Sequence, residues 1–183
     1  ASALTLCLSW QARAPHERSP VRNFYLRRLF RVLPMFHSAI AFYLLLYGFG
    51  PRYWAPSGLA WWYAPLTASC LHAFHPETIN SVVPGGWSIG VEMTFYLLLP
   101  LVLRYARSVA SLLGLFAGSW LIAMFAREPL IALLRPYYPP DQQYLLGPFF
   151  NLTFLGQLPV FALGLLTYRA CALPSGKRRA LGA

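Results

Sequence analysis

The segment WSIGVEMTFYLLLPLVL, residues 87–103, constrains the fold more than any other part of the chain. It is long and apolar enough to lie in a lipid bilayer, yet it carries one carboxylate, Glu92, near its start. An isolated charge at the centre of a bilayer costs about 2.5–3.5 kcal/mol on insertion scales, and such residues usually have a partner or a task. The segment therefore predicts a membrane helix whose glutamate is paired or functional.

The composition of the whole chain is that of a membrane protein. It is 57% hydrophobic and 11% charged, whereas soluble domains are about 25% charged. Aromatic residues make up 16%, which suits belts at the two membrane interfaces. A chain of 183 residues has room for one bundle of about four or five membrane segments. We therefore expect an all-α, polytopic transmembrane helix bundle.

Four apolar segments are predicted to span the membrane, at about residues 32–49, 87–103, 109–126 and 149–168. A fifth, residues 58–74, contains Pro65 and His72. The basic residues of segments 13–31 and 104–107 should both lie on the cytoplasmic side, so an even number of crossings must separate them. Residues 58–74 are therefore interpreted as a re-entrant or interfacial segment.

The net charge of +10 does not indicate a nucleic-acid partner. Most of the fifteen basic residues fall in three clusters, within residues 13–31, 104–107 and 169–179, and each cluster adjoins an apolar segment. A nucleic-acid-binding protein would show a solvated basic face instead. The clusters are interpreted as signals that fix the cytoplasmic side of the membrane helices.

Arginines open the first apolar segment, in FYLRRLFRVLPMF, residues 24–36. Arg28 and Arg31 are three residues apart and so share one face of a helix, while Arg27 points elsewhere. Arginine offers phosphate a permanent charge and a planar, bidentate donor, and a helix N-terminus favours anions. The pattern predicts a site for a phosphate-bearing ligand. Topology signalling or binding of lipid headgroups explains the same residues.

Two of these motifs resemble the membrane acyltransferase 3 family, integral-membrane enzymes that O-acylate extracytoplasmic glycans. FYLRRLFRVLPMF is similar to the family's Arg-x-x-Arg segment, matched here by Arg28 and Arg31 with Pro34 after them. WSIGVEMTFYLLLPL is similar to its Trp-Ser-x-x-x-Glu-x-x-Phe-Tyr-Leu helix. LPVFALGLL, residues 158–166, resembles a later helix with a Phe-x-x-Gly pattern. The resemblance identifies residues 1–183 as a partial acyltransferase 3 membrane domain.

The chain also departs from the family's pattern. Members have more spanning helices, and their first helix carries a histidine proposed to act in acyl transfer. Here residues 1–10 look like the last turns of a helix, and residue 1 is not methionine. We therefore expect a fragment that lacks the first helix and the C-terminal helices, and we expect the isolated fragment to be inactive.

The resemblance implies a membrane-bound O-acyltransferase of the bacterial inner membrane. It would move an acyl group, expected to be acetyl, from cytoplasmic acyl-CoA to a hydroxyl of a cell-surface glycan or glycoside, as in the O-acetylation of a polysaccharide. Arg28 and Arg31 would bind the donor, and Glu92 would act as general base or orient the histidine. Acyl-CoA is a substrate, and no bound cofactor is expected. Expected partners are membrane lipid, acyl-CoA, a glycan acceptor and a periplasmic domain.

The alternative is a non-catalytic membrane module, such as a transporter segment or a sensory or scaffolding bundle. In that reading Glu92 forms a structural ion pair with an arginine of another helix, and the basic clusters only fix topology.

Candidate acceptor-side residues lie in HAFHPE, residues 72–77, and at the start of the glutamate segment. They are His72, His75, Trp87 and Ser88. The HAFHPE spacing suits a metal, but Pro76 would break the helix that one-face geometry needs, so no metal site is expected. Packing at the membrane interface is the alternative explanation of both histidines. Trp87 is also interpreted as an interfacial anchor, and Ser88 as a helix N-cap or a packing group rather than a nucleophile.

Overall fold

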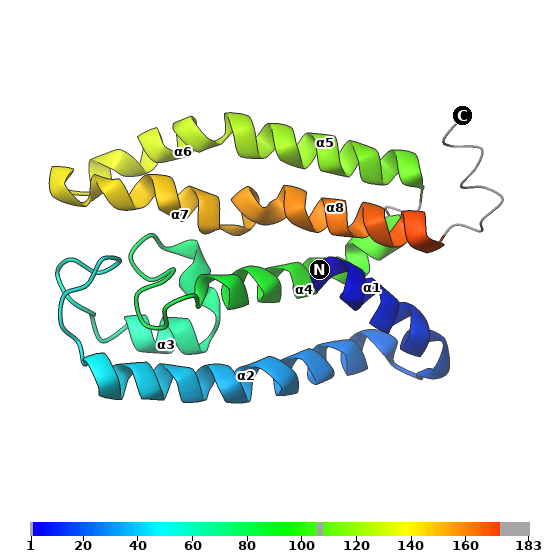
Figure 1. The fold of residues 1–183 in the computed structure, drawn as a ribbon, viewed down its shortest axis with the longest axis horizontal. Coiled ribbons are helices and arrows are strands. Elements are labelled where there is room, and N and C mark those ends of the chain that lie inside the picture. The colour runs from blue at the N-terminus through cyan, green and yellow to red at the C-terminus, as the bar shows by residue number, and fades with distance from the viewer. Residues whose placement is uncertain (1, 106–107, 173–183) are drawn as a thin grey trace.

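The computed structural model describes residues 2–105 and 108–172, and the described chain folds into helices joined by loops (Figure 1). The elements are α1 (Ser2–Arg13), η1 (Ala14–His16), α2 (Pro20–Tyr47), α3 (Tyr63–Ala68), η2 (Leu71–Phe74), α4 (Trp87–Tyr105), α5 (Val109–Phe125), α6 (Arg127–Leu134), η3 (Arg135–Tyr137), η4 (Pro140–Leu145), α7 (Leu146–Leu152) and α8 (Phe154–Ala172). The predicted all-α bundle is confirmed.

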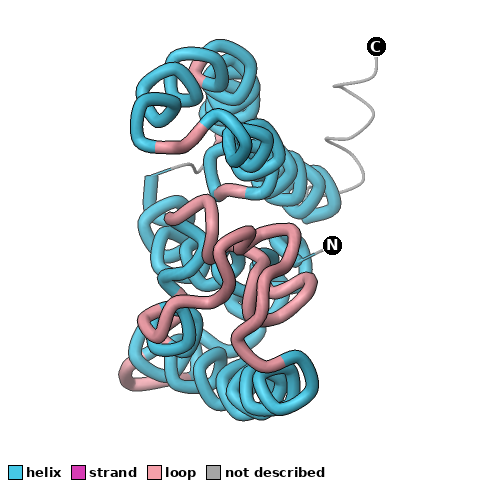
Figure 2. Tube along the Cα trace, turned by 90° about the vertical axis from the view of Figure 1, so that its left-hand side faces the viewer, coloured by secondary structure: helices cyan, strands magenta, loops and turns pink. Residues whose placement is uncertain are grey.

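The helices form two layers, with α5 to α8 in one and α1 to α4 in the other (Figure 1). Arg22, Arg104 and Arg169 belong to helix termini that share one end of the bundle, called here the basic end. The opposite end, called the loop end, carries residues 48–62 and 75–86, and Figure 2 looks onto it. The described parts of the three basic clusters therefore share one end, as the parity argument requires. Arg107 and residues 177–179 fall outside the described residues.

Three described helical segments are long and apolar enough to cross a membrane: Pro20–Tyr47, Trp87–Tyr105 and Pro140–Cys171. Val109–Phe125 and Arg127–Tyr137 form a fourth if they are taken as one span bent by 42°. The sequence predicted four or five membrane segments. The structure has four if this bent pair is counted as one span, and three if it is not.

Helix α2 begins earlier than the sequence analysis expected. The prediction started the span at residue 32, where the charges end, but the helix starts at Pro20 and runs for 28 residues. Proline is well tolerated in the first turn of a helix, where its missing N–H has no intrahelical partner to lose. The arginines therefore lie inside the helix, and Arg28 is about 12 Å along its axis.

The predicted span 149–168 is interrupted. Helix α7 ends at Leu152 and α8 begins at Phe154. Gly156 makes this junction compact, because a Cβ on it would lie 2.4 Å from the carbonyl oxygen of Phe150. Hydropathy does not reveal such a break, since both helices are apolar.

Residues 58–74 form α3 and η2, each far shorter than a membrane crossing. The chain reverses between them at Cys70, which adopts the left-handed conformation with φ 62°. Gly90 then lets α4 approach the turn closely, because a Cβ on Gly90 would lie 2.6 Å from the Cβ of Ala73. The segment thus enters the bundle from the loop end and packs beside α4.

Two hydrophobic clusters hold α2 and α4 in place. Near the basic end, Phe95 of α4 stacks on Phe161 of α8 at 4.2 Å, and Phe24 of α2 meets Tyr96 of α4 edge-on at 6.2 Å. Toward the loop end, Phe36 and Ile40 of α2 pack in a second cluster with Tyr63. Helix α2 is therefore fixed against α4 on the face that carries Arg28.

Candidate functional site

Arg28 lies where α2 faces α4. Its side chain is half-buried, and the guanidinium carbon is 5.7 Å from the ring centre of Phe24 and 5.8 Å from that of Tyr96. Arginine is weakly hydrated and stacks on aromatic rings. The two rings therefore orient the guanidinium without using its N–H groups, which remain suited to an anionic ligand.

Glu92 lies on the facing helix. The hydroxyl of Tyr96, one turn further along α4, donates a hydrogen bond to Glu92 Oε2 at 2.8 Å. The carboxylate also interacts electrostatically with Arg28. The two residues singled out from separate motifs are thus brought to one place. Tyr96 was missed by the sequence analysis, although its i, i+4 spacing from Glu92 was a readable signal.

Arg27 separates from Arg28 and Arg31 on α2, as the helical spacing predicts. Arg27 pairs with Glu17, which precedes the helix, at 2.5 Å. Arg28 and Arg31 both act electrostatically on Tyr96 and on each other, and Arg31 is exposed. Because Glu17 neutralises Arg27, the positive charge on the Tyr96 side comes from Arg28 and Arg31.

A cavity of about 380 Å³ opens beside these groups, between α2, α4 and the α3–η2 turn. Arg28 and Tyr96 line it, together with apolar side chains such as Leu29, Met93 and Leu97. A largely apolar pocket with a few convergent polar groups is the usual form of a small-molecule site. It is our candidate active site.

His72 is 1% exposed. Its Nε2 donates to the carbonyl of Gly86 at 3.0 Å, its ring lies 5.5 Å from that of Phe36, and its Nδ1 is buried with no partner among the described residues. Burial lowers the pKa of His72, and the bond to Gly86 opposes this shift. A neutral, buried imidazole of this kind holds η2 against the start of α4. Its predicted acceptor-side role stays a prediction.

His75 lies in a separate cluster at the loop end. Its ring meets Trp62 edge-on at 5.2 Å, and its Nδ1 accepts the backbone N–H of Glu77 at 3.3 Å. The hydroxyl of Tyr63 donates to Glu77 Oε2. Burial and the Glu77 carboxylate raise the pKa of Tyr138 to about 12. Glu77 is therefore held at the loop end by its hydrogen bond from Tyr63.

One interpretation of the α4 start is wrong. Ser88 does not cap the helix, because α4 already begins at Trp87, and the hydroxyl of Ser88 donates to the carbonyl of Gly85 at 3.0 Å. Trp87 is half-buried and packs against the cluster that holds Phe95. An acceptor role for either residue stays a prediction.

His37 is a hydrogen-bonded helix residue, as one would expect of a lone histidine on an apolar helix. Its Nε2 donates to the carbonyl of Ala68 at 3.1 Å and so ties α2 to the end of α3.

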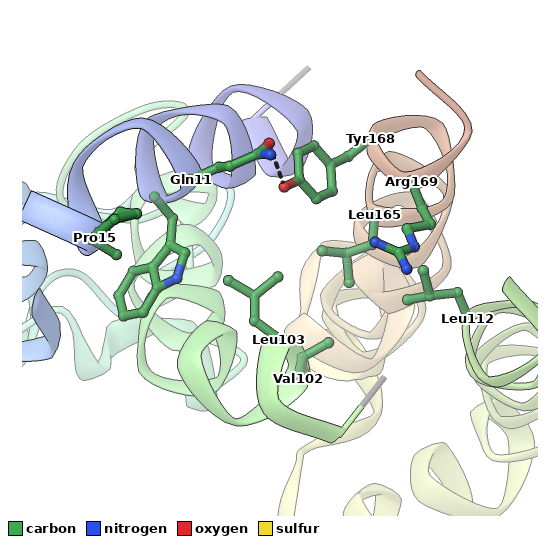
Figure 3. Close-up of a pocket in the computed structure, with 10 residues that line it drawn as sticks. Gln11, Pro15, Val102, Leu103, Leu112, Leu165, Tyr168 and Arg169 are labelled. Carbon is green, nitrogen blue, oxygen red and sulfur yellow. Dashed lines mark hydrogen bonds between the residues drawn. The ribbon is translucent and has the colours of Figure 1, made fainter. Parts of the chain in front are cut away.

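A second cavity, of about 390 Å³, lies at the basic end between α1, α4, α5 and α8 (Figure 3). There Tyr168 donates to Gln11 Oε1 at 2.8 Å, and Arg169 supplies a guanidinium. None of the site residues predicted from the sequence lines this cavity. It is therefore separate from Arg28 and Tyr96, which line the candidate active site.

The sequence comparison decides between the two classes of function left open above. The model of the acyltransferase 3 family, described as an acyltransferase domain, matches residues 2–181. The chain belongs to this family. No curated protein and no solved structure shows significant similarity to the chain. With the apolar helices of the fold, membership makes the protein a membrane acyltransferase.

Proposed function

We propose that this acyltransferase moves an acetyl group from acetyl-CoA, arriving at the basic end, to a hydroxyl of a glycan on the loop-end side. The observation that carries the proposal is the meeting of Arg28 with the Glu92–Tyr96 pair beside one cavity. Glu92 lies about 7.5 Å along α4 from its loop-end start, and Arg28 lies about 12 Å along α2 from its basic-end start. A donor and an acceptor from opposite sides can therefore meet between them.

The chemistry follows from these two groups. The acceptor hydroxyl attacks the thioester carbonyl, a C–O bond forms and the C–S bond breaks. The hydroxyl proton passes to the Glu92 carboxylate, which returns a proton to the departing CoA thiolate. The guanidinium of Arg28 offsets the negative charge that develops. The family resemblance offers a histidine as the first proton acceptor, with Glu92 orienting it.

Tyr96 has a positioning role in this scheme. Its hydrogen bond to Glu92 holds the carboxylate in one orientation. Its ring packs against the guanidinium of Arg28, so Tyr96 contacts both Arg28 and Glu92. The donor's phosphates would reach Arg31, which is exposed on the same side of α2.

The non-catalytic alternative rests on the same contacts, because the hydrogen bond from Tyr96 is also a way of satisfying a buried carboxylate. Under that reading Glu92→Gln lowers the thermal stability of the bundle and removes no specific activity.

Sidedness tests the proposal. Radiolabelled acetyl-CoA is supplied to inside-out and to right-side-out membrane vesicles that contain the complete protein and surface glycan. The account expects label in the glycan only when the basic end faces the medium. Labelling from either side, or none in either preparation, would refute it.

A further inference from the structure

A cavity of about 350 Å³ lies at the loop end, outside the candidate active site. Two loops build it, one following α2 and one preceding α4. The residues that shape it are Tyr47, Arg52, Tyr53, Trp54, Asn80 and Ser81.

Arg52 holds the two loops together. It donates to the carbonyl of Ser81 at 3.0 Å from one loop and to that of Gly48 at 2.7 Å from the other. Its guanidinium carbon also lies 5.9 Å from the ring centre of Tyr47. The wall is therefore built before any ligand arrives, which reduces the ordering cost of binding.

The aromatic part of the wall sits on a tight turn. Arg52 and Ala55 exchange both backbone hydrogen bonds, at 3.0 and 2.9 Å. Tyr53 and Trp54 occupy the tip of this turn, with ring centres 5.4 Å apart. Tyr144 stabilises the turn. Its ring packs on that of Tyr53 with ring centres 5.1 Å apart, and its hydroxyl donates to the carbonyl of Tyr53 at 2.7 Å. The turn thus presents fixed aromatic faces.

The polar part of the wall comes from the second loop. Asn80 Oδ1 accepts the N–H of Gly85 at 2.7 Å, which fixes the orientation of its amide and leaves the NH₂ group as donor. Ser81 is 1% exposed, and its hydroxyl is buried with no partner among the described residues. This hydroxyl is closed off from the cavity, so Ser81 contributes to the wall through its backbone carbonyl, which accepts from Arg52.

These features point to one class of ligand. Aromatic faces beside a fixed amide donor suit a ring that is apolar on one side and carries hydroxyls at its edge. The lining residues include no carboxylate, so a cation is not favoured. Arg52 already donates to backbone carbonyls, so a strongly anionic ligand would compete with the bonds that build the wall.

We propose that the loop-end cavity binds an uncharged sugar ring of the glycan acceptor. This inference rests on the proposed function and adds the place where the acceptor is held. The second loop leads directly into α4, and Pro84 of the lining precedes its first residue by three positions. The second loop therefore connects the proposed sugar site to the helix that carries Glu92.

Binding can be measured without catalysis. The complete protein in lipid nanodiscs is mixed with a panel of methyl glycosides of glucose, galactose, rhamnose and N-acetylglucosamine, and contact is detected by saturation-transfer NMR. We expect at least one glycoside to bind, with Trp54→Ala weakening its affinity by about fivefold or more. Trp61→Ala is the matched control, because Trp61 is 80% exposed and does not line the cavity.

Trp54→Phe keeps an aromatic face and should retain most of the binding. This variant therefore shows whether Trp54→Ala weakens binding by removing the contact or by unfolding the loop. The proposal is overturned if no glycoside of the panel binds, or if Trp54→Ala and Trp61→Ala bind alike. This binding assay contains no acetyl-CoA and so does not depend on catalysis. If a glycoside binds here but the vesicle assay with acetyl-CoA shows no transfer, the result counts against the proposed function alone.

Discussion

The hydroxyl of Tyr96 donates to the carboxylate of Glu92 at 2.8 Å, one turn apart on α4, while the ring of Tyr96 lies 5.8 Å from the guanidinium carbon of Arg28 on α2. One side chain thus links a carboxylate and a cation that the sequence places 64 positions apart. The group proposed for proton transfer, Glu92, and the group proposed for donor binding, Arg28, therefore lie close together, and Tyr96 positions both.

Tyr96→Phe should lower kcat for acyl transfer by about 10- to 150-fold, because a hydrogen bond to a charged group contributes about 1.5–3 kcal/mol. Tyr168→Phe is the matched control, because it removes a 2.8 Å hydroxyl bond to Gln11 away from the site. Equal kinetics in the two variants would deny Tyr96 a positioning role.

Arg28→Ala should weaken acetyl-CoA binding by about 10-fold or more, because charge-assisted bonds to phosphate are lost. Arg31→Ala should act in the same direction. Arg169→Ala, which removes a guanidinium from the basic-end cavity, should leave the affinity close to that of the wild type. Titration calorimetry in detergent gives the three dissociation constants, and an effect confined to Arg169 would move the donor site to the cavity of Figure 3.

Gly90→Ala should destabilise the protein by about 1–3 kcal/mol, the usual cost of overpacking. Its new methyl group would lie 2.6 Å from the Cβ of Ala73. Gly114→Ala is the control on α5, where a Cβ meets nothing within 4 Å and a helical alanine is favoured. Thermal unfolding in detergent compares them, and an unchanged midpoint for Gly90→Ala would mean that η2 is not packed against α4.

Stability should fall as the pH drops below about 6.5, the ordinary pKa of histidine. Burial lowers the pKa of both His72 and His75 in the folded protein. Between that lowered value and 6.5 the unfolded chain binds more protons than the folded one, so acidification favours unfolding. Midpoints measured from pH 5 to pH 8 should therefore rise and level off. The double variant His72→Gln, His75→Gln should give a flatter curve, and a curve parallel to the wild type would refute the assignment.

The sequence was sufficient for the residues that lie on regular helices. The spacing of Arg28 and Arg31 predicts their shared face, and the parity of the basic clusters predicts that residues 58–74 do not cross. The contact of Tyr96 with Glu92 could have been predicted from their spacing of four residues on a helix. The prediction missed it because Tyr96 carries no charge. The start of α2 was misplaced because the prediction followed hydropathy, while the helix continues through charged residues.

Features that depend on tertiary contact could not be predicted. The break at Thr153 follows from a close approach between Gly156 and the carbonyl of Phe150. The burial of His72 depends on Phe36 and Gly86, which come from two other parts of the chain. The loop-end cavity combines loops about 30 residues apart, joined by bonds from Arg52 to backbone carbonyls that carry no sequence signal.

The central claim is that Glu92 takes part in acyl transfer, and Glu92→Gln in the complete protein tests it most directly. The measurement is kcat with radiolabelled acetyl-CoA, alongside the dissociation constant for acetyl-CoA. Glu128→Gln serves as control, because Glu128 is an exposed carboxylate paired with Arg127. The account predicts a fall in kcat of about 100-fold or more for Glu92→Gln with donor affinity unchanged. A normal kcat with a lowered unfolding temperature would contradict it and make Glu92 a structural residue.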